Sequence, residues 1–209
     1  MSPPPPQPEP TDEALLAAGR KGDDTAFGTL INRYQQELFH FLLRFTRNRA
    51  AADDLFQETF LQVYLAADRF DVDKRFKPWL FTIAANKARD YLRRNRKRQT
   101  AALSAEATPG HEGGRTFMEL LAADLPEPPQ VAEDADTAQR VRDVVDTLPE
   151  HLREILLLAY FQQLPYRDIA DVLGVPLGTV KSRLHAAVGS FADLWRRKYE
   201  DSPNPDPAE

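Results

Sequence analysis

The sequence of 209 residues contains no cysteine, which excludes disulfide bonds, cysteine-ligated zinc and thiol redox chemistry. It also has no apolar run that approaches the roughly 18 residues of a membrane span. The proline-rich start, Ser2 to Pro10, lacks the basic and apolar parts of a secretory signal. We therefore expect a soluble, cytoplasmic protein that does not insert into membranes.

Signals of catalysis and of metal binding are absent as well. The four histidines are scattered among different predicted elements and do not have the spacing of metal ligands. The sequence contains neither a glycine-rich phosphate loop nor a nucleophile motif. We expect no catalytic residue, no metal and no cofactor, so the chain is not predicted to be an enzyme. The histidines are His40, His111, His151 and His185.

Charge is strongly segregated along the chain, although the net charge is only −5. Residues 69 to 98 contain eleven lysines and arginines against three aspartates, whereas residues 119 to 136 contain six acids and no base. A basic block of this kind is typical of surfaces that bind polyanions such as DNA, and it fits a merely solvated face equally well. The negative net charge therefore does not exclude a nucleic-acid partner.

Composition divides the chain into two folded regions joined by a segment rich in alanine, glycine, proline and acids. Proline and glycine disfavour regular structure in this segment, although Phe117 to Leu125 has the pattern of a short amphipathic helix. Both ends of the chain are polar and punctuated by proline, so we expect them to be disordered. The predicted boundaries are 1–11 for the first tail, 12–99 for the first region, 100–135 for the linker, 136–199 for the second region and 200–209 for the last tail.

Apolar residues in the first region recur at steps of three and four, which is typical of helices with one buried face. The pattern predicts helices over residues 25 to 46, from about Ala50, and from Pro78, a residue type favoured in the first turn of a helix. The residues predicted to be buried are Phe27, Leu30, Ile31, Tyr34, Leu38, Phe41, Leu42 and Phe45 in the first helix, Leu55, Phe56, Thr59, Phe60 and Val63 in the second, and Leu80, Ile83, Ala84, Ala88 and Tyr91 in the third.

The opposite faces of the second and third helices carry polar side chains. At 100° per residue, the second helix presents a stripe that consists of Asp54, Gln57, Glu58 and Leu61. Taken alone, this stripe is best interpreted as a solvated helix face, and its open carboxylates are not a catalytic pair. The third helix presents Thr82, Asn86, Arg89 and Arg93.

The second region has the same helical periodicity and contains a helix-turn-helix pattern. Helices are predicted over residues 166 to 173 and 177 to about 198, with a Gly-Val-Pro turn between them. Ala170, Gly174 and Val180 supply the small crossing residue, the turn glycine and the branched packing residue that this motif needs. From spacing alone, an ordinary helical hairpin remains the alternative. Polar residues suited to the major groove occupy the start of the second helix: Thr179, Lys181, Ser182, Arg183 and His185.

Stretches in both regions resemble one protein family. Residues 53 to 60, 76 to 86 and 91 to 94 resemble region two of extracytoplasmic-function (group IV) sigma factors, which belong to the sigma-70 family. Residues 148 to 149 and 178 to 184 resemble region four. No strand-like alternation occurs, so the predicted fold is all-α: a region-2 helical bundle and a region-4 helix-turn-helix domain, joined by a flexible linker.

The resemblance implies a partner for each surface. The stripe from Asp54 to Leu61 would dock on the clamp helices of the polymerase β′ subunit, and the second region would contact the β flap. Phe70 also fits a core position and Asn86 also fits a solvated one, so both alternatives stay open. The residues implied to bind the minus-ten element are Phe70, Lys77, Thr82, Asn86, Arg89, Arg93 and Arg94, and those implied to bind the minus-thirty-five element are Thr179, Lys181, Ser182, Arg183 and His185.

The implied function is that of a sigma factor, which carries core RNA polymerase to promoter DNA and helps to melt the minus-ten element through binding energy alone. The family also implies an anti-sigma factor as regulator. A stand-alone helix-turn-helix regulator remains the main alternative, and a nucleic-acid enzyme is a weaker one. The linker fits a polymerase channel and a plain tether alike, and it permits a closed pair of regions that hides their DNA-binding surfaces.

Overall fold

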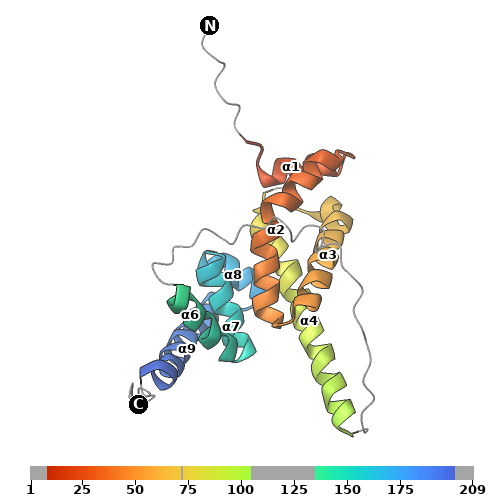
Figure 1. The fold of residues 1–209 in the computed structure, drawn as a ribbon. Helices are drawn as coiled ribbons and strands as arrows, with labels where there is room; N and C mark the ends of the chain where they lie inside the picture. Colours follow the sequence, from red (N-terminus) through yellow and green to blue (C-terminus); the bar gives the residue numbers. More distant parts are fainter. Residues whose placement is uncertain (1–8, 72, 105–134, 201–209) are drawn as a thin grey trace.

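The computed structural model describes residues 9–71, 73–104 and 135–200, and Figure 1 shows their arrangement. Regular structure in these ranges is entirely helical, which confirms the predicted all-α fold. None of the helices within them is long and apolar enough to cross a membrane. The predicted helix at Phe117 to Leu125 and most of the predicted linker and tails lie outside the described residues.

The first region is built around the helix α2 (Asp24–Thr46), against which the other helices of the region pack. Short polar side chains define three of the helix starts. Thr11, Asp23 and Asn48 each accept a hydrogen bond from the backbone N–H three residues later, which satisfies a group that the helix itself leaves unpaired. The elements are α1 (Asp12–Gly19), α2 (Asp24–Thr46), α3 (Arg49–Ala66), the 3₁₀ turn η1 (Ala67–Arg69) and α4 (Phe76–Ser104).

The starts of these helices show where the nearby sequence sets the first residue of a helix and where a distant residue does. α2 and α3 begin within one residue of their predicted starts. α4 instead begins two residues before the predicted Pro78, at Phe76. There the carboxylate of Glu13 accepts a hydrogen bond of 2.9 Å from the backbone N–H of Phe76, whose side chain is fully buried. The sequence patterns do not predict α1, which supplies Glu13, so they miss this long-range contact.

The second region consists of shorter helices. Pro149, Pro165 and Pro176 stand directly before three of them, where the helix does not need a backbone N–H. Gly174 adopts φ 63° and ψ 37° in the turn between the last two helices, a left-handed conformation that suits glycine. The elements are α6 (Ala135–Thr147), α7 (Glu150–Leu156) with the π-helical turn η3 (Leu157–Phe161), α8 (Tyr166–Leu173), and α9 (Leu177–Trp195) with the π-helical turn η4 (Arg196–Glu200).

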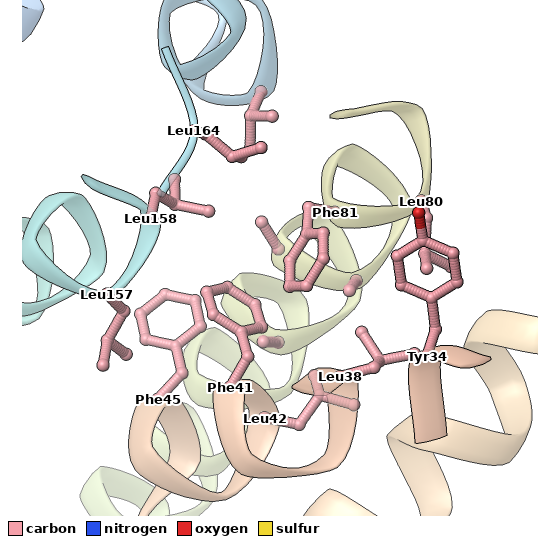
Figure 2. Close-up of a cluster of buried hydrophobic side chains, with 14 of the residues drawn as sticks. Tyr34, Leu38, Phe41, Leu42, Phe45, Leu80, Phe81, Leu157, Leu158 and Leu164 are labelled. Atoms are coloured by element: carbon pink, nitrogen blue, oxygen red, sulfur yellow. The ribbon is translucent and has the colours of Figure 1, made fainter. Parts of the chain in front are cut away.

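One buried apolar cluster runs through both regions. Figure 2 shows Phe41 and Phe45 of α2 and Phe81 of α4 near Leu157 and Leu158 of η3, and all five side chains are buried. In addition, α8 packs against α4, and Figure 1 shows α7 and α8 beside the first region. The structure thus has the closed pairing of regions that the sequence left open.

Candidate nucleic-acid and protein interfaces

The predicted stripe on α3 is exposed. Asp54, Gln57 and Glu58 face solvent, and Leu61 is 59% exposed. Glu58 forms an ion pair of 3.2 Å with Lys87, so its carboxylate lies on the side of α3 that faces α4. The stripe offers two carboxylates, an amide and one apolar side chain, a combination that can pair with arginines of a protein partner while excluding water.

Two apolar residues that the sequence reasoning omitted extend this stripe. Tyr64 and Leu65 are 56% and 67% exposed, one helical turn after Leu61. The Tyr64 ring meets the Phe27 ring edge-on, with 5.5 Å between their centroids, which holds it on the surface of the first region. Their spacing of three and four residues from Leu61 is the signal that would have identified them, because such residues share one helix face.

The polar face of α4 is only partly free. Asn86, Arg93 and Arg94 are exposed and can reach bases or phosphates. Thr82 donates a hydrogen bond of 2.8 Å to a backbone carbonyl one turn earlier, and Lys77 pairs with a glutamate of α2 at 2.5 Å. Thr82 and Lys77 therefore already have partners inside the first region, and so does Arg93, which forms an ion pair of 3.0 Å with Asp90 on the same helix.

Phe70 lies in the core of the first region. It is 7% exposed, and its ring centroid lies 4.8 Å from that of Trp79 and 6.3 Å from that of Phe76. These contacts favour the core position that the sequence left open for this residue. A direct contact between Phe70 and a DNA base stays a prediction, and it would require the ring to leave these partners.

Arg89 contacts the second region. Its Nε donates a hydrogen bond of 2.9 Å to the Glu154 carboxylate, and its Nη2 donates one of 3.0 Å to the backbone carbonyl of Val172. Burial raises the pKa of Glu154, and the neighbouring Arg89 guanidinium opposes that rise. The side chain predicted to bind minus-ten DNA is thus occupied by an acid of α7.

The helix-turn-helix packs as its spacing predicts. Val180 and Ile169 are fully buried, and they join α9 to α8. Lys181, Ser182 and His185 are exposed at the start of α9, where a recognition helix meets the major groove. Thr179 and Arg183 belong to the same face and are partly buried, and the backbone carbonyl of Thr179 accepts a hydrogen bond of 3.1 Å from Ser182.

A cavity of about 470 Å³ lies between the two regions. Arg89 and Arg96 enter it from α4, and Arg183 enters it from the recognition helix. Arg96 also forms an ion pair of 2.6 Å with Glu150. The cavity therefore brings together arginines that the sequence assigns to separate DNA elements. Its lining is completed by Glu150, His151, Glu154 and Leu173.

Arg153 is a further residue that the sequence reasoning missed. It is 2% exposed, and it donates hydrogen bonds to the backbone carbonyls of Phe45 in α2 (3.1 Å) and Asp146 at the end of α6 (3.3 Å). Burial and the nearby Arg47 lower the pKa of Arg153 to about 10, so it stays charged at neutral pH. The sequence carried no clear signal for this residue, because Glu150, His151 and Glu154 surround it and make it look like one more solvated charge.

Comparisons with known proteins match both regions in order. The family model for sigma-70 region 2 matches residues 30–98, and the model for sigma-70 region 4 matches residues 138–189. The chain is 33% identical over 177 residues to the RNA polymerase sigma-H factor of Pseudomonas aeruginosa, which covers 84% of this chain and 89% of that protein. It is 31% identical over 167 residues to the ECF RNA polymerase sigma factor SigW of Bacillus subtilis, with coverage of 79% and 87%.

The fold has a counterpart among solved structures. The structure of CnrH in complex with the cytosolic domain of CnrY matches with a TM-score of 0.63 at 26% identity, and the match covers 90% of this chain and 98% of that one. The two family regions together span more than half of the chain, and the relatives align with most of its length. The chain therefore belongs to the sigma-70 family of RNA polymerase sigma factors, in its extracytoplasmic-function group.

Proposed function

We propose that this chain binds core RNA polymerase in the cytoplasm, directs it to specific promoters and helps to melt the minus-ten DNA, without making or breaking a covalent bond itself. The observation that carries the proposal is the pairing of two exposed features in one chain: the stripe from Asp54 to Leu61 on α3 and the start of the recognition helix α9. A stand-alone DNA-binding regulator would need only the second of them.

The start of α9 is suited to read the minus-thirty-five element. Lys181 and His185 are exposed there and can reach phosphates, and Ser182 can hydrogen-bond to a base edge. Arg183 would add a contact of two hydrogen bonds to guanine once it leaves the cavity between the regions. Contacts with the DNA backbone would set the position of α9, and contacts with the bases would supply specificity.

The first region is suited to hold the minus-ten element. Asn86 and the exposed arginines of α4 supply an amide for base edges and cations for the backbone. Capture of an extruded base offsets a pairing and stacking cost of a few kcal/mol, so binding energy can drive melting. We infer that single-stranded DNA crosses α4 near Asn86 and continues along Arg93 and Arg94.

A regulatory protein partner is part of the proposal. The relative CnrH was solved in complex with the cytosolic domain of a second protein, CnrY, which supports a partner of this kind for the present chain. We propose that an anti-sigma factor binds this chain and blocks its access to core polymerase. A pull-down from the native host followed by inhibition of transcription in vitro would test this partner.

Run-off transcription with purified core polymerase, followed by mapping of the start sites, tests the function. The wild-type chain should support specific initiation, and the double change Asp54→Ala and Glu58→Ala should reduce initiation at least about tenfold, because it removes both carboxylates that would pair with the polymerase. The matched control, Asp193→Ala with Glu200→Ala, removes two exposed acids of α9 and η4 and should retain activity.

One combination of results would establish the rival function. If the chain binds duplex promoter DNA tightly and specifically without core polymerase, and the double change on α3 leaves transcription intact, the chain is a stand-alone helix-turn-helix regulator. Equal losses in the α3 variant and in the control would show a general effect of net charge rather than a docking surface.

A further inference from the structure

Helix α1 contacts both ends of the connection between η1 and α4. At one end, Arg20, the residue directly after α1, forms an ion pair of 3.0 Å with Asp68 of η1. At the other end, the Glu13 carboxylate of α1 accepts the hydrogen bond of 2.9 Å from the backbone N–H of Phe76, the first residue of α4. A helix of eight residues thus spans this connection from its start to its end.

The cap that Glu13 provides replaces one that the local sequence lacks. A helix start is usually capped by a serine, threonine, aspartate or asparagine in the preceding position, whose side chain accepts a backbone hydrogen bond. Arg75 occupies that position before α4, and a guanidinium group has no acceptor. The carboxylate of Glu13 supplies the acceptor and also places a negative charge at the positive end of the helix dipole. The start of α4 therefore depends on α1.

α1 is itself held firmly on α2. Leu15 and Leu16 are 5% and 1% exposed and belong to the buried cluster of the chain. The carboxylate of Asp12, at the start of α1, accepts hydrogen bonds from the hydroxyl of Tyr34 and from the guanidinium group of Arg33, both in α2. Because apolar and polar contacts both fix α1, it can hold the connection in place rather than follow it.

Two candidate minus-ten residues lie at the ends of this connection. Phe70 follows η1 directly, and Lys77 is the second residue of α4. The ring centroids of Phe70 and Phe76 are 6.3 Å apart, so the residue that Glu13 caps also sets the place of Phe70. A site that is ordered before it binds does not lose affinity to the ordering of its own chain. α1 thus holds the part of the first region where an extruded base would bind.

We propose that α1 is a brace that keeps the connection between η1 and α4 ordered for the capture of minus-ten bases, with Glu13 and Arg20 as its two positioning residues. This inference rests on the proposed function for its DNA partner, whereas the brace itself is a property of the free chain. It predicts that loss of the brace weakens the binding of minus-ten DNA and spares the binding of core polymerase.

Hydrogen exchange in the free chain tests the brace itself. Glu13→Ala should raise the exchange rate of the Phe76 amide about fivefold, on the scale of a lost helix cap. Glu13→Gln should retain most of the protection, because its side-chain oxygen still accepts the hydrogen bond. Arg20→Ala should raise the exchange rate of the Phe70 amide only about twofold, since the Asp68 side chain is 85% exposed and its ion pair is weak.

Binding of DNA by the holoenzyme tests what the brace does. The probes are labelled single-stranded oligonucleotides from each strand of the minus-ten region of a promoter with a mapped start site, and fluorescence anisotropy measures their affinity. Glu13→Ala should weaken binding of the strand that the wild type captures about fivefold, whereas Glu13→Gln should stay within about twofold of the wild type. Both changes remove one negative charge, which by itself favours DNA binding, so only a positioning role predicts this difference.

Further measurements separate the brace from a general loss of structure. All variants should bind core polymerase, and a duplex that carries only the minus-thirty-five element, as well as the wild type does. The control Asp24→Ala removes an exposed acid in the first turn of α2 and should leave exchange rates and affinities unchanged. An unchanged minus-ten affinity in Glu13→Ala, an equal loss in Glu13→Gln, or an equal loss of core binding would overturn the proposal. A wild-type holoenzyme that binds neither strand would refute the proposed function, while hydrogen exchange would still decide whether α1 holds this connection.

Discussion

Asp53 is a buried carboxylate of α3, whereas the next residue, Asp54, is exposed. Asp53 is 5% exposed, and its Oδ1 has no hydrogen-bond partner among the described residues. Burial raises the pKa of Asp53, and Arg49 opposes that rise. Between the ordinary pKa of aspartate and the raised pKa of the folded chain, the unfolded carboxyl is charged while the folded one still holds its proton. The free energy of unfolding therefore falls as the pH rises through this interval.

Replacement of Asp53 should therefore stabilise the chain at neutral pH. We expect Asp53→Ala to raise the free energy of unfolding by about 1 kcal/mol at pH 7, because it removes an unpaired buried polar atom. The gain should shrink as the pH falls toward the ordinary pKa of aspartate, where the wild-type carboxyl is protonated in both states. Urea unfolding across this pH range measures the difference, and a less stable variant at pH 7 would contradict the argument.

Arg47 carries backbone strain at the end of α2. Its φ of 56° and ψ of 26° are left-handed, a conformation that costs a residue with a Cβ about 1 kcal/mol and that glycine adopts freely. Arg47 also lies near enough to the buried Arg153 to lower its pKa. Arg47→Gly should raise the free energy of unfolding by about 0.5–1 kcal/mol in urea. Arg47→Ala removes the charge but keeps the Cβ, so it should recover less of this energy.

The turn between α8 and α9 has the opposite arrangement, because there glycine already occupies the left-handed position. No atom lies within 4 Å of a Cβ built on Gly174, so the cost of a side chain is purely conformational. Gly174→Ala should lower the free energy of unfolding by about 1 kcal/mol and reduce the melting temperature. Gly178, in the first turn of α9, also has open space around it and has no positive φ.

The matched control follows from that difference. Gly178→Ala should be neutral or stabilising, because alanine favours helix at a position without steric conflict. Differential scanning calorimetry on both variants separates conformation from packing. If both glycine changes destabilise the chain equally, the left-handed backbone at Gly174 is not the cause.

The whole molecule shares one buried cluster, which couples its two regions. Phe45 of α2 packs near Leu157 of η3, and its carbonyl accepts the hydrogen bond from the buried Arg153. Separation of the regions would expose apolar surface on both sides, so at low salt we expect a single calorimetric transition. The calorimetric and van't Hoff enthalpies should agree. Two resolved transitions at low salt would show that the regions unfold independently.

Local signals in the sequence were sufficient for most of the helices and for the exposed part of the candidate site. The three- and four-residue periodicity predicts α2 and α3 to within one residue at their starts, and it places the stripe of Asp54, Gln57 and Glu58 on the solvent side. In the same way, Gly174 in the turn predicts the helix-turn-helix. These features depend on side chains within a few turns of one helix, so short stretches of sequence determine them.

The tertiary structure decided the remaining features. α4 starts at Phe76 because Glu13, from another helix, caps it, and Phe70 lies in the core because Trp79 folds back against it. Arg89 is occupied by Glu154 although the two lie 65 positions apart in the sequence. Helical periodicity says which face of a helix is polar but not which distant element meets that face. The sequence by itself therefore determined most of the helices and the family, whereas only the packing of one region on the other decided that Arg89 already has a partner.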